Sequence, residues 1–127
     1  MRVDLIDGLG QVSRSVADLA AASAWYGDVL GLTHLFTFGK MAFFDCGGIR
    51  LMLAEDPAAA APSLLYFRVC EIHAACAELQ ARGAAMRSPP HLVHTHADGS
   101  EEWMAFIDDL EGRPLGLMAR TGGGSAA

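Results

Sequence analysis

The stretch GLGQVSRSVADLAAASAWYGDVLGL, residues 8–32, determines the fold expected for this chain. From Gln11 to Val16 the side chains alternate between a polar side and a mostly apolar side, as they do in a half-buried strand. Asp18 is a predicted N-cap, and apolar side chains then recur at helical spacing as far as Leu30. Gly31 can adopt the left-handed conformation that ends a helix. The stretch therefore predicts a strand at 8–16 followed by a helix at 19–30.

The rest of the chain continues this pattern and then repeats it. Three strands are predicted next, at 32–38, 41–46 and 49–54, and a linker follows at 55–62. The second set comprises a strand at 63–69, a helix at 71–82, extended segments at 84–88 and 91–95 separated by Pro89-Pro90, strands at 101–108 and 115–120, and a flexible tail at 121–127. A period this long that occurs only twice indicates a duplicated half-domain. We expect one domain made of a first module at 8–54 and a second at 63–120.

Composition excludes several classes of function. The chain has 127 residues and a net charge of −6, and its nine basic residues are scattered, which argues against nucleic acid as a partner. No apolar run approaches the roughly 18 residues of a membrane span, so we expect no membrane partner. The first seven residues carry two acids and lack the apolar run of a signal peptide. The expected location is the cytoplasm.

Three stretches together resemble a known family. They are residues 8–32, LLYFRVCEIHAACAELQARG at 64–83 and MAFIDDLEGRPLGLM at 104–118. The chain resembles proteins of the vicinal oxygen chelate superfamily, which includes glyoxalases, bleomycin resistance proteins and extradiol dioxygenases. This resemblance, over about residues 8–119, implies an α+β fold in which two βαβββ modules form a cup-shaped eight-stranded mixed sheet. It also implies a ligand inside the cup and, as in the bleomycin resistance branch, a homodimer.

The resemblance also implies where a metal would be bound. Metal-dependent members hold a divalent ion on side chains from the first and fourth strands of each module. Those positions correspond to Gln11, Met52, Leu64 and Gly116. Metal ions in proteins are bound by imidazole, carboxylate or thiolate groups, whereas this set offers one neutral amide oxygen and one thioether. We therefore expect no metal at this position and no other cofactor, with a displaced site at His94, His96 and Glu102 as an alternative.

Strand alternation predicts which side chains line the cup. The expected lining is aromatic and rich in methionine, with few polar groups, which is typical of a site for a flat apolar ligand. His34, Phe36 and Phe38 are expected to share one face of their strand, and Gly116 is expected to leave room in the wall. The alternative is that these side chains fill a collapsed core. The predicted ligand-binding residues are Gln11, Ser13, His34, Phe36, Phe38, Arg50, Met52, Leu64, Tyr66, His94, Trp103, Gly116 and Met118.

Two assignments within this set have alternatives. Trp103 and Met104 alternate, and we expect Trp103 in the wall of the cup, with a position in the core as the alternative. His34 or His94 could act as a general base, because imidazole titrates near neutral pH. The sequence shows no partner that would orient either ring, so no catalytic residue is assigned.

These observations favour a metal-independent small-molecule-binding protein over an enzyme. The expected role is to sequester an aromatic drug or natural product, as in self-resistance to an antibiotic. The alternative is a glyoxalase-like lyase, isomerase or dioxygenase that acts on a small substrate in the same cup. Such enzymes use a metal to polarise a substrate oxygen. The four positions that would hold this metal lack suitable ligands, so they do not support the alternative.

Overall fold

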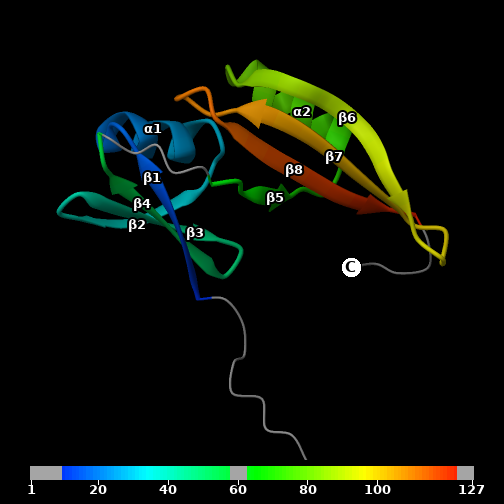
Figure 1. Cartoon of the computed structure of the whole chain (residues 1–127), viewed down its shortest axis with the longest axis horizontal. Helices are drawn as coiled ribbons and strands as arrows, with labels where there is room; N and C mark the ends of the chain where they lie inside the picture. Colours follow the sequence, from blue (N-terminus) through cyan, green and yellow to red (C-terminus); the bar gives the residue numbers. More distant parts are fainter. Residues whose placement is uncertain (1–9, 58–62, 123–127) are drawn as a thin grey trace, which may run out of the picture. The chain divides into compact units, whose positions relative to one another are not determined.

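A computed structural model describes residues 10–57 and 63–122, and the chain divides into two compact units, Met1–Ala61 and Pro62–Ala127 (Figure 1). Each unit contains one of the two modules. Parts of three predicted segments lie outside the described residues: the beginning of the first strand at 8–9, the linker from 58 onward, and the tail from 123 onward.

The first module contains five elements in the predicted order. They are β1 (Gln11–Val16), α1 (Leu19–Asp28), β2 (Thr33–Phe38), β3 (Met41–Cys46) and β4 (Ile49–Glu55). The helix begins after Asp18, whose carboxylate accepts a hydrogen bond from the backbone N–H of Ala21 at 3.0 Å, as predicted for an N-cap. The strands form a mixed sheet in the order β1-β4-β3-β2, in which β1 and β4 are parallel and the other neighbours are antiparallel.

The helix covers one face of this sheet. On that face the buried side chains of Phe44 and Leu53 pack with Tyr26 of α1, whose ring centroid lies 6.5 Å from that of Phe44. Arg14 is also buried on this face, as the alternation of β1 predicts. We call the opposite face the open face of the first module. It carries Gln11, Ser13, Phe36, Phe38, Phe43, Arg50 and Met52.

The second module repeats the order of elements. They are β5 (Tyr66–Arg68), α2 (Ile72–Ala81), β6 (Ala85–Thr95), β7 (Glu101–Asp108) and β8 (Pro114–Thr121). The strand order β5-β8-β7-β6 matches that of the first module, again with parallel pairing of the first and last strands. The core under α2 includes Ile72, Ile107 and Leu117. The predicted α+β fold of two βαβββ modules is confirmed, and the eight strands are organised as two four-stranded mixed sheets.

The prediction that Pro89-Pro90 separates two extended segments is wrong. Residues 85–95 form the single strand β6, whose pairing with β7 shifts register between Met86 and Ser88, between Ser88 and His91, and between Leu92 and His94. The strand lies at the edge of its sheet. A proline has no backbone N–H to donate, and it is tolerated there on the side of the strand that makes no ladder hydrogen bonds. Edge position and irregular pairing together accommodate both prolines.

Among the described residues, no helix is both long enough and apolar enough to cross a membrane.

The parallel pairing of β5 and β8 brings Tyr66 directly opposite Gly116. The tyrosine ring lies over the glycine so closely that a Cβ atom added at Gly116 would meet the ring carbons, with Cε2 at 2.8 Å. The expectation that Gly116 leaves room in the wall is therefore corrected, because the aromatic ring of Tyr66 fills that space. Glycine at this point of the strand permits the close approach.

This packing predicts the effect of a single methyl group. Gly116→Ala forces the Tyr66 ring to move, and we expect it to reduce the free energy of unfolding by about 1–3 kcal/mol, as overpacking does. The cost should become smaller in a Tyr66→Ala background, because the two positions are coupled. Gly10→Ala is the control, since no described atom lies within 4 Å of its added Cβ. Urea unfolding measures all four variants, and equal costs of Gly116→Ala in both backgrounds would contradict the packing.

Candidate functional site

A row of side chains crosses all four strands on the open face of the first module. The guanidinium of Arg50 on β4 donates from Nε to Oε1 of Gln11 on β1 at 2.8 Å. Its Cζ also lies 5.1 Å from the ring centroid of Phe43 on β3, within cation–π range. The ring of Phe43 stacks on Phe36 of β2, with centroids 4.4 Å apart and planes at 23°. Because β3 lies between β2 and β4, Phe43 has an aromatic neighbour on one side and a cation on the other.

This row explains why Phe43 is buried on a face that no helix covers. Its side chain is only 7% exposed, whereas Phe36 is 45% exposed and Phe38 is 69% exposed. Phe36 and Arg50 shield Phe43 and hold its ring in place. Phe36 and Phe38 are exposed to solvent on β2, at the edge of the sheet, and Phe36 packs on the buried ring of Phe43.

Gln11, Ser13, Arg50 and Met52 lie on one face, as strand alternation predicts. Gln11 pairs with Arg50 and Ser13 pairs with Met52 in the parallel β1–β4 register. The amide nitrogen of Gln11 faces the sulfur of Met52 at 3.7 Å, so both ends of this amide have protein partners. Ser13 is exposed beside them. The polar part of this face is therefore organised by contacts within the protein.

The prediction that His34 shares a face with Phe36 and Phe38 is wrong. The pairing of β2 with β3 shifts register between His34 and Phe36, so a bulge separates them. Phe36 pairs with Phe43 on the open face, whereas His34 pairs with Phe44. The imidazole packs edge-on against the Phe44 ring, with centroids 5.3 Å apart, and its Nε2 lies 2.8 Å from Oγ1 of Thr37. His34 therefore belongs to the helix-facing side of the sheet.

The second module also has an open face, opposite α2. Tyr66, Gly116 and Met118 lie on it, as predicted, and Arg68 pairs with Met118 on the same side. The ring of Tyr66 meets Phe106 of β7 edge-on, with centroids 5.9 Å apart.

The prediction that Trp103 lines the cup is wrong. Trp103 pairs with Ala119, whose side chain is buried on the helix-facing side, and its ring packs edge-on against His73 of α2 at 5.5 Å between centroids. Met104 pairs with Met118 and so takes the position on the open face. Alternation alone cannot distinguish the two neighbours, because the choice depends on the register with β8.

The positions that the resemblance assigns to metal ligands do not fit a metal ion in either module. In the first module, Oε1 of Gln11 already accepts the Arg50 hydrogen bond, which leaves the thioether of Met52. In the second module, β5 is shorter than predicted, so Leu64 lies before the strand and exposes an aliphatic side chain. Tyr66 covers Gly116. Neither pair supplies the imidazole, carboxylate or thiolate that binding needs.

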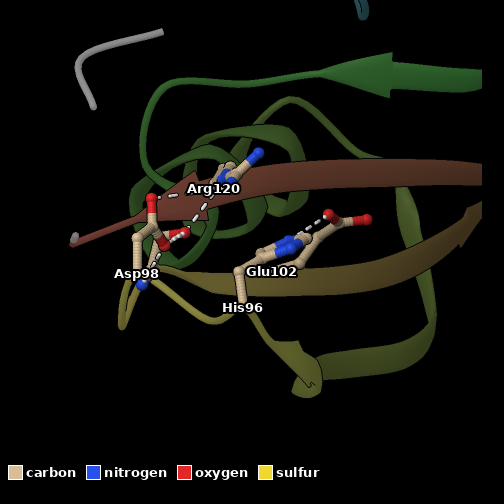
Figure 2. Close-up of polar contacts among 5 residues, drawn as sticks. His96, Asp98, Glu102 and Arg120 are labelled. Atoms are coloured by element: carbon tan, nitrogen blue, oxygen red, sulfur yellow. Dashed lines mark hydrogen bonds and ion pairs between the residues drawn. The ribbon is translucent and has the colours of Figure 1, made fainter. Parts of the chain in front are cut away.

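An oriented histidine lies at the end of the second module where β7 begins. Nε2 of His96 lies 3.0 Å from Oε1 of Glu102, and both side chains are about one quarter exposed (Figure 2). An ionised carboxylate can only accept, so this contact places a hydrogen on Nε2 and leaves Nδ1 of the neutral ring as an acceptor. His94, which pairs with Glu102 in the β6–β7 ladder, brings its ring to 4.5 Å from that of His96. The sequence grouped His96 and Glu102 only as members of the alternative metal site, and their pairing with each other was not predicted.

A second polar group stands beside this pair. The buried hydroxyl of Ser100 donates to Oδ1 of Asp98 at 2.6 Å and accepts from Nε of Arg120 at 3.0 Å. The backbone N–H of Ser100 also donates to Oδ1 of Asp98 at 2.9 Å. These bonds hold the pKa of the Asp98 carboxyl below its ordinary value, with a smaller contribution from the nearby charge of Arg120. The available sequence signal is the polar segment HADGSEE at residues 96–102, which turns back on itself.

The alternative metal site at His94, His96 and Glu102 is not assembled. In residues 10–57 and 63–122, no three His, Cys, Asp or Glu side chains form a group that could hold a metal ion. The contacts in this region instead pair one imidazole with one carboxylate, and one arginine with a serine and an aspartate.

Comparison with known proteins identifies the family. The Glyoxalase/Bleomycin resistance protein/Dioxygenase superfamily matches residues 8–99, so the chain belongs to this superfamily. No curated protein matches it significantly.

Solved structures show the same fold at low sequence identity. A lactoylglutathione lyase from Agrobacterium tumefaciens is 22% identical with a TM-score of 0.72, and the match covers 91% of this chain and 96% of that one. A protein from the mobile metagenome of V. Pseudocholerae has 17% identity, a TM-score of 0.75 and coverages of 95% and 100%. A glyoxalase/bleomycin resistance protein/dioxygenase from Nocardioides has 21% identity, a TM-score of 0.69 and coverages of 98% and 91%. At these identities the likeness establishes the fold alone.

The contacts of Asp98 predict how its titration responds to mutation. Ser100→Ala removes the hydroxyl that contributes most to the lowered pKa, so the pKa of Asp98 should rise towards 3.8. Arg120→Gln should raise it less. Because the folded-state pKa is lowered, ionised Asp98 stabilises the fold above about pH 4, and this stabilisation is lost as the pH falls through the folded pKa. Carbon NMR titration of the carboxyl group measures the pKa, and an unchanged value in Ser100→Ala would refute the assignment.

Proposed function

We propose that this chain is a metal-independent binding protein that sequesters a small aromatic drug or natural product. The proposal rests on the row of side chains on the open face of the first module, in which Phe36 and Arg50 both pack against the ring of Phe43. A rigid, exposed aromatic surface next to a few polar groups suits the recognition of a flat molecule.

The binding energy of such a guest comes mainly from apolar burial. Phe36 and Phe38 expose much of their surface, and the neighbouring thioether of Met52 can adapt to ligands of different shape. Ring-on-ring contact adds to the burial of area. The open face of the second module offers Tyr66, Met104 and Met118, which are of the same chemical kind.

Metal independence is supported by the chemistry of the side chains at the family's ligand positions. They comprise an amide that is engaged by Arg50, a thioether, an aliphatic side chain and a glycine beneath an aromatic ring. Reactions that polarise a substrate oxygen with a metal have no corresponding group among these four.

A metal-free enzyme is the second candidate, and one observation favours it. The contact between His96 and Glu102 orients an imidazole, which is the arrangement of a general base. His94, a predicted ligand-binding residue, lies next to this imidazole. If the bound molecule is chemically altered, this pair is the first place to look for the responsible group.

A homodimer forms part of the proposal. Strand β2 lies at the edge of its sheet and is exposed throughout, and its exposed apolar side chains include Leu35, which is not among the residues proposed to contact the ligand. Exposed apolar edge strands in soluble proteins are usually covered by another element or another chain. A second copy of this chain would cover this edge by symmetric pairing.

Substitutions on the open face test the sequestration proposal. Titration of a hydroxyanthraquinone natural product by calorimetry should show that Phe36→Ala weakens binding by about 2–3 kcal/mol, or about 30- to 150-fold. Ser13→Ala removes one neutral hydrogen bond and should cost only about 0.5–1.5 kcal/mol. Trp103→Phe is the matched aromatic control, because Trp103 packs against α2, and it should leave the affinity unchanged.

Mass spectrometry of the recovered anthraquinone distinguishes binding from catalysis. The proposal predicts that the ligand returns unaltered. If the ligand is altered, and His96→Gln stops the alteration without weakening binding, the protein is an enzyme and the sequestration proposal is wrong.

Elemental analysis tests metal independence separately. After mild dialysis, the purified protein should contain no stoichiometric divalent ion, because neither module provides a suitable donor set. One equivalent of zinc, iron, nickel or manganese would contradict this expectation and direct attention to His94, His96 and Glu102.

A further inference from the structure

We propose that the aromatic guest carries an anionic group, such as a carboxylate, and that Arg50 recognises it. This inference rests on the proposed binding function and specifies the chemical class of the ligand. It also differs from what the overall charge suggests, since a net charge of −6 would attract cations over long range. The local geometry of the first module favours a negatively charged ligand.

Arg50 keeps part of its hydrogen-bonding capacity for a ligand. Its Nε donates to Gln11, and no acceptor among the described residues is paired with its two terminal nitrogens. The side chain is exposed, so both terminal nitrogens can reach a ligand. A guanidinium with two free, coplanar nitrogens matches the two oxygens of a carboxylate.

Among the described residues, no carboxylate forms an ion pair with this guanidinium. Asp45 lies opposite Arg50 in the β3–β4 register and is the nearest acid in the sheet. Its Oδ1 accepts from the backbone N–H of Gly48 at 3.3 Å, and within the described residues no ion pair joins Asp45 to Arg50. The arginine is thus positioned by a neutral amide, and Asp45, although it lies on the same face, makes no direct ion pair with it.

The charge of Arg50 adjoins the aromatic surface. Phe36 and Arg50 contact the same Phe43 ring, at 4.4 Å and 5.1 Å respectively. A molecule of two fused rings with a carboxylate substituent can therefore stack on the exposed phenylalanines while its carboxylate meets the guanidinium. Gln11 acts as a positioning residue, because its amide oxygen accepts the Nε hydrogen bond and leaves both terminal nitrogens for a ligand.

Three matched ligands test the inference: 2-naphthoate, 2-naphthalenemethanol and 2-naphthylmethylamine, which is cationic at neutral pH. Calorimetric titration of the full chain should show that naphthoate binds about tenfold more tightly than the alcohol, and that the amine binds most weakly. The preference for naphthoate should decrease with added salt, because the ion pair is exposed. The affinity for the alcohol should not change with salt.

Variants of Arg50 assign the preference to this residue. Arg50→Gln should lower the affinity for naphthoate to that for the alcohol. Arg50→Lys should keep part of the preference, because it retains the charge but loses the paired nitrogens. Arg82→Gln is the matched control, since Arg82 is paired with Glu78 on α2, and it should behave as the wild type. Circular dichroism verifies that each variant is folded.

The outcomes separate this inference from the proposed function. If the alcohol binds but naphthoate shows no preference, the anionic guest is ruled out and aromatic binding stands. If the preference survives undiminished in Arg50→Gln, Arg50 does not recognise the anion and the inference is wrong, while aromatic binding again stands. If none of the three ligands binds, both proposals fail. A preference for naphthoate that disappears in Arg50→Gln and persists in Arg82→Gln is the result that supports the inference.

Discussion

The parallel pairing between the first and last strands of each module is the constraint on which the other features depend. Parallel neighbours cannot be joined by a tight turn, so the intervening chain must leave the sheet as a helix and return through a hairpin. The helix then covers one face, and the other face stays open. The same pairing places Gln11 beside Arg50 in one module and Tyr66 beside Gly116 in the other.

These two pairs give the open faces different properties. In the first module, an amide positions a guanidinium against a stack of aromatic rings and leaves that cation available to solvent. In the second, a glycine accommodates a tyrosine ring, so the corresponding position is filled by apolar contact. Both arrangements include positions that the family resemblance assigns to metal ligands. The groups at these positions contact other groups of the protein and do not form a set of metal ligands. The binding function proposed for the chain depends on this difference.

Much of the fold could be predicted from local signals. Asp18, the glycine turns and the strand alternation predicted both helices and the first hairpins, because these features depend on neighbouring residues. The errors arose where pairing between strands decides the outcome. The bulge after His34 moves that ring to the helix-facing side, and the edge position of β6 tolerates two prolines. For the site, the chemistry of Gln11 and Met52 was visible in the sequence. The orientation of Trp103 and the ring above Gly116 depend on register with β8, and the sequence does not encode that register locally.

The proposed binding site depends on Gln11, which holds Arg50 in place on the open face of the first module. The most direct measurement is the nitrogen and proton NMR signal of the Arg50 Nε–H group, compared between the wild type and Gln11→Leu. If the hydrogen bond to Gln11 holds the guanidinium, the wild-type signal should be shifted and should exchange slowly with water. In the variant, it should return to the position and the fast exchange of a free arginine. An Nε–H signal that is unaffected by Gln11→Leu would show that the guanidinium is not held by this hydrogen bond and would contradict the proposed arrangement of the site.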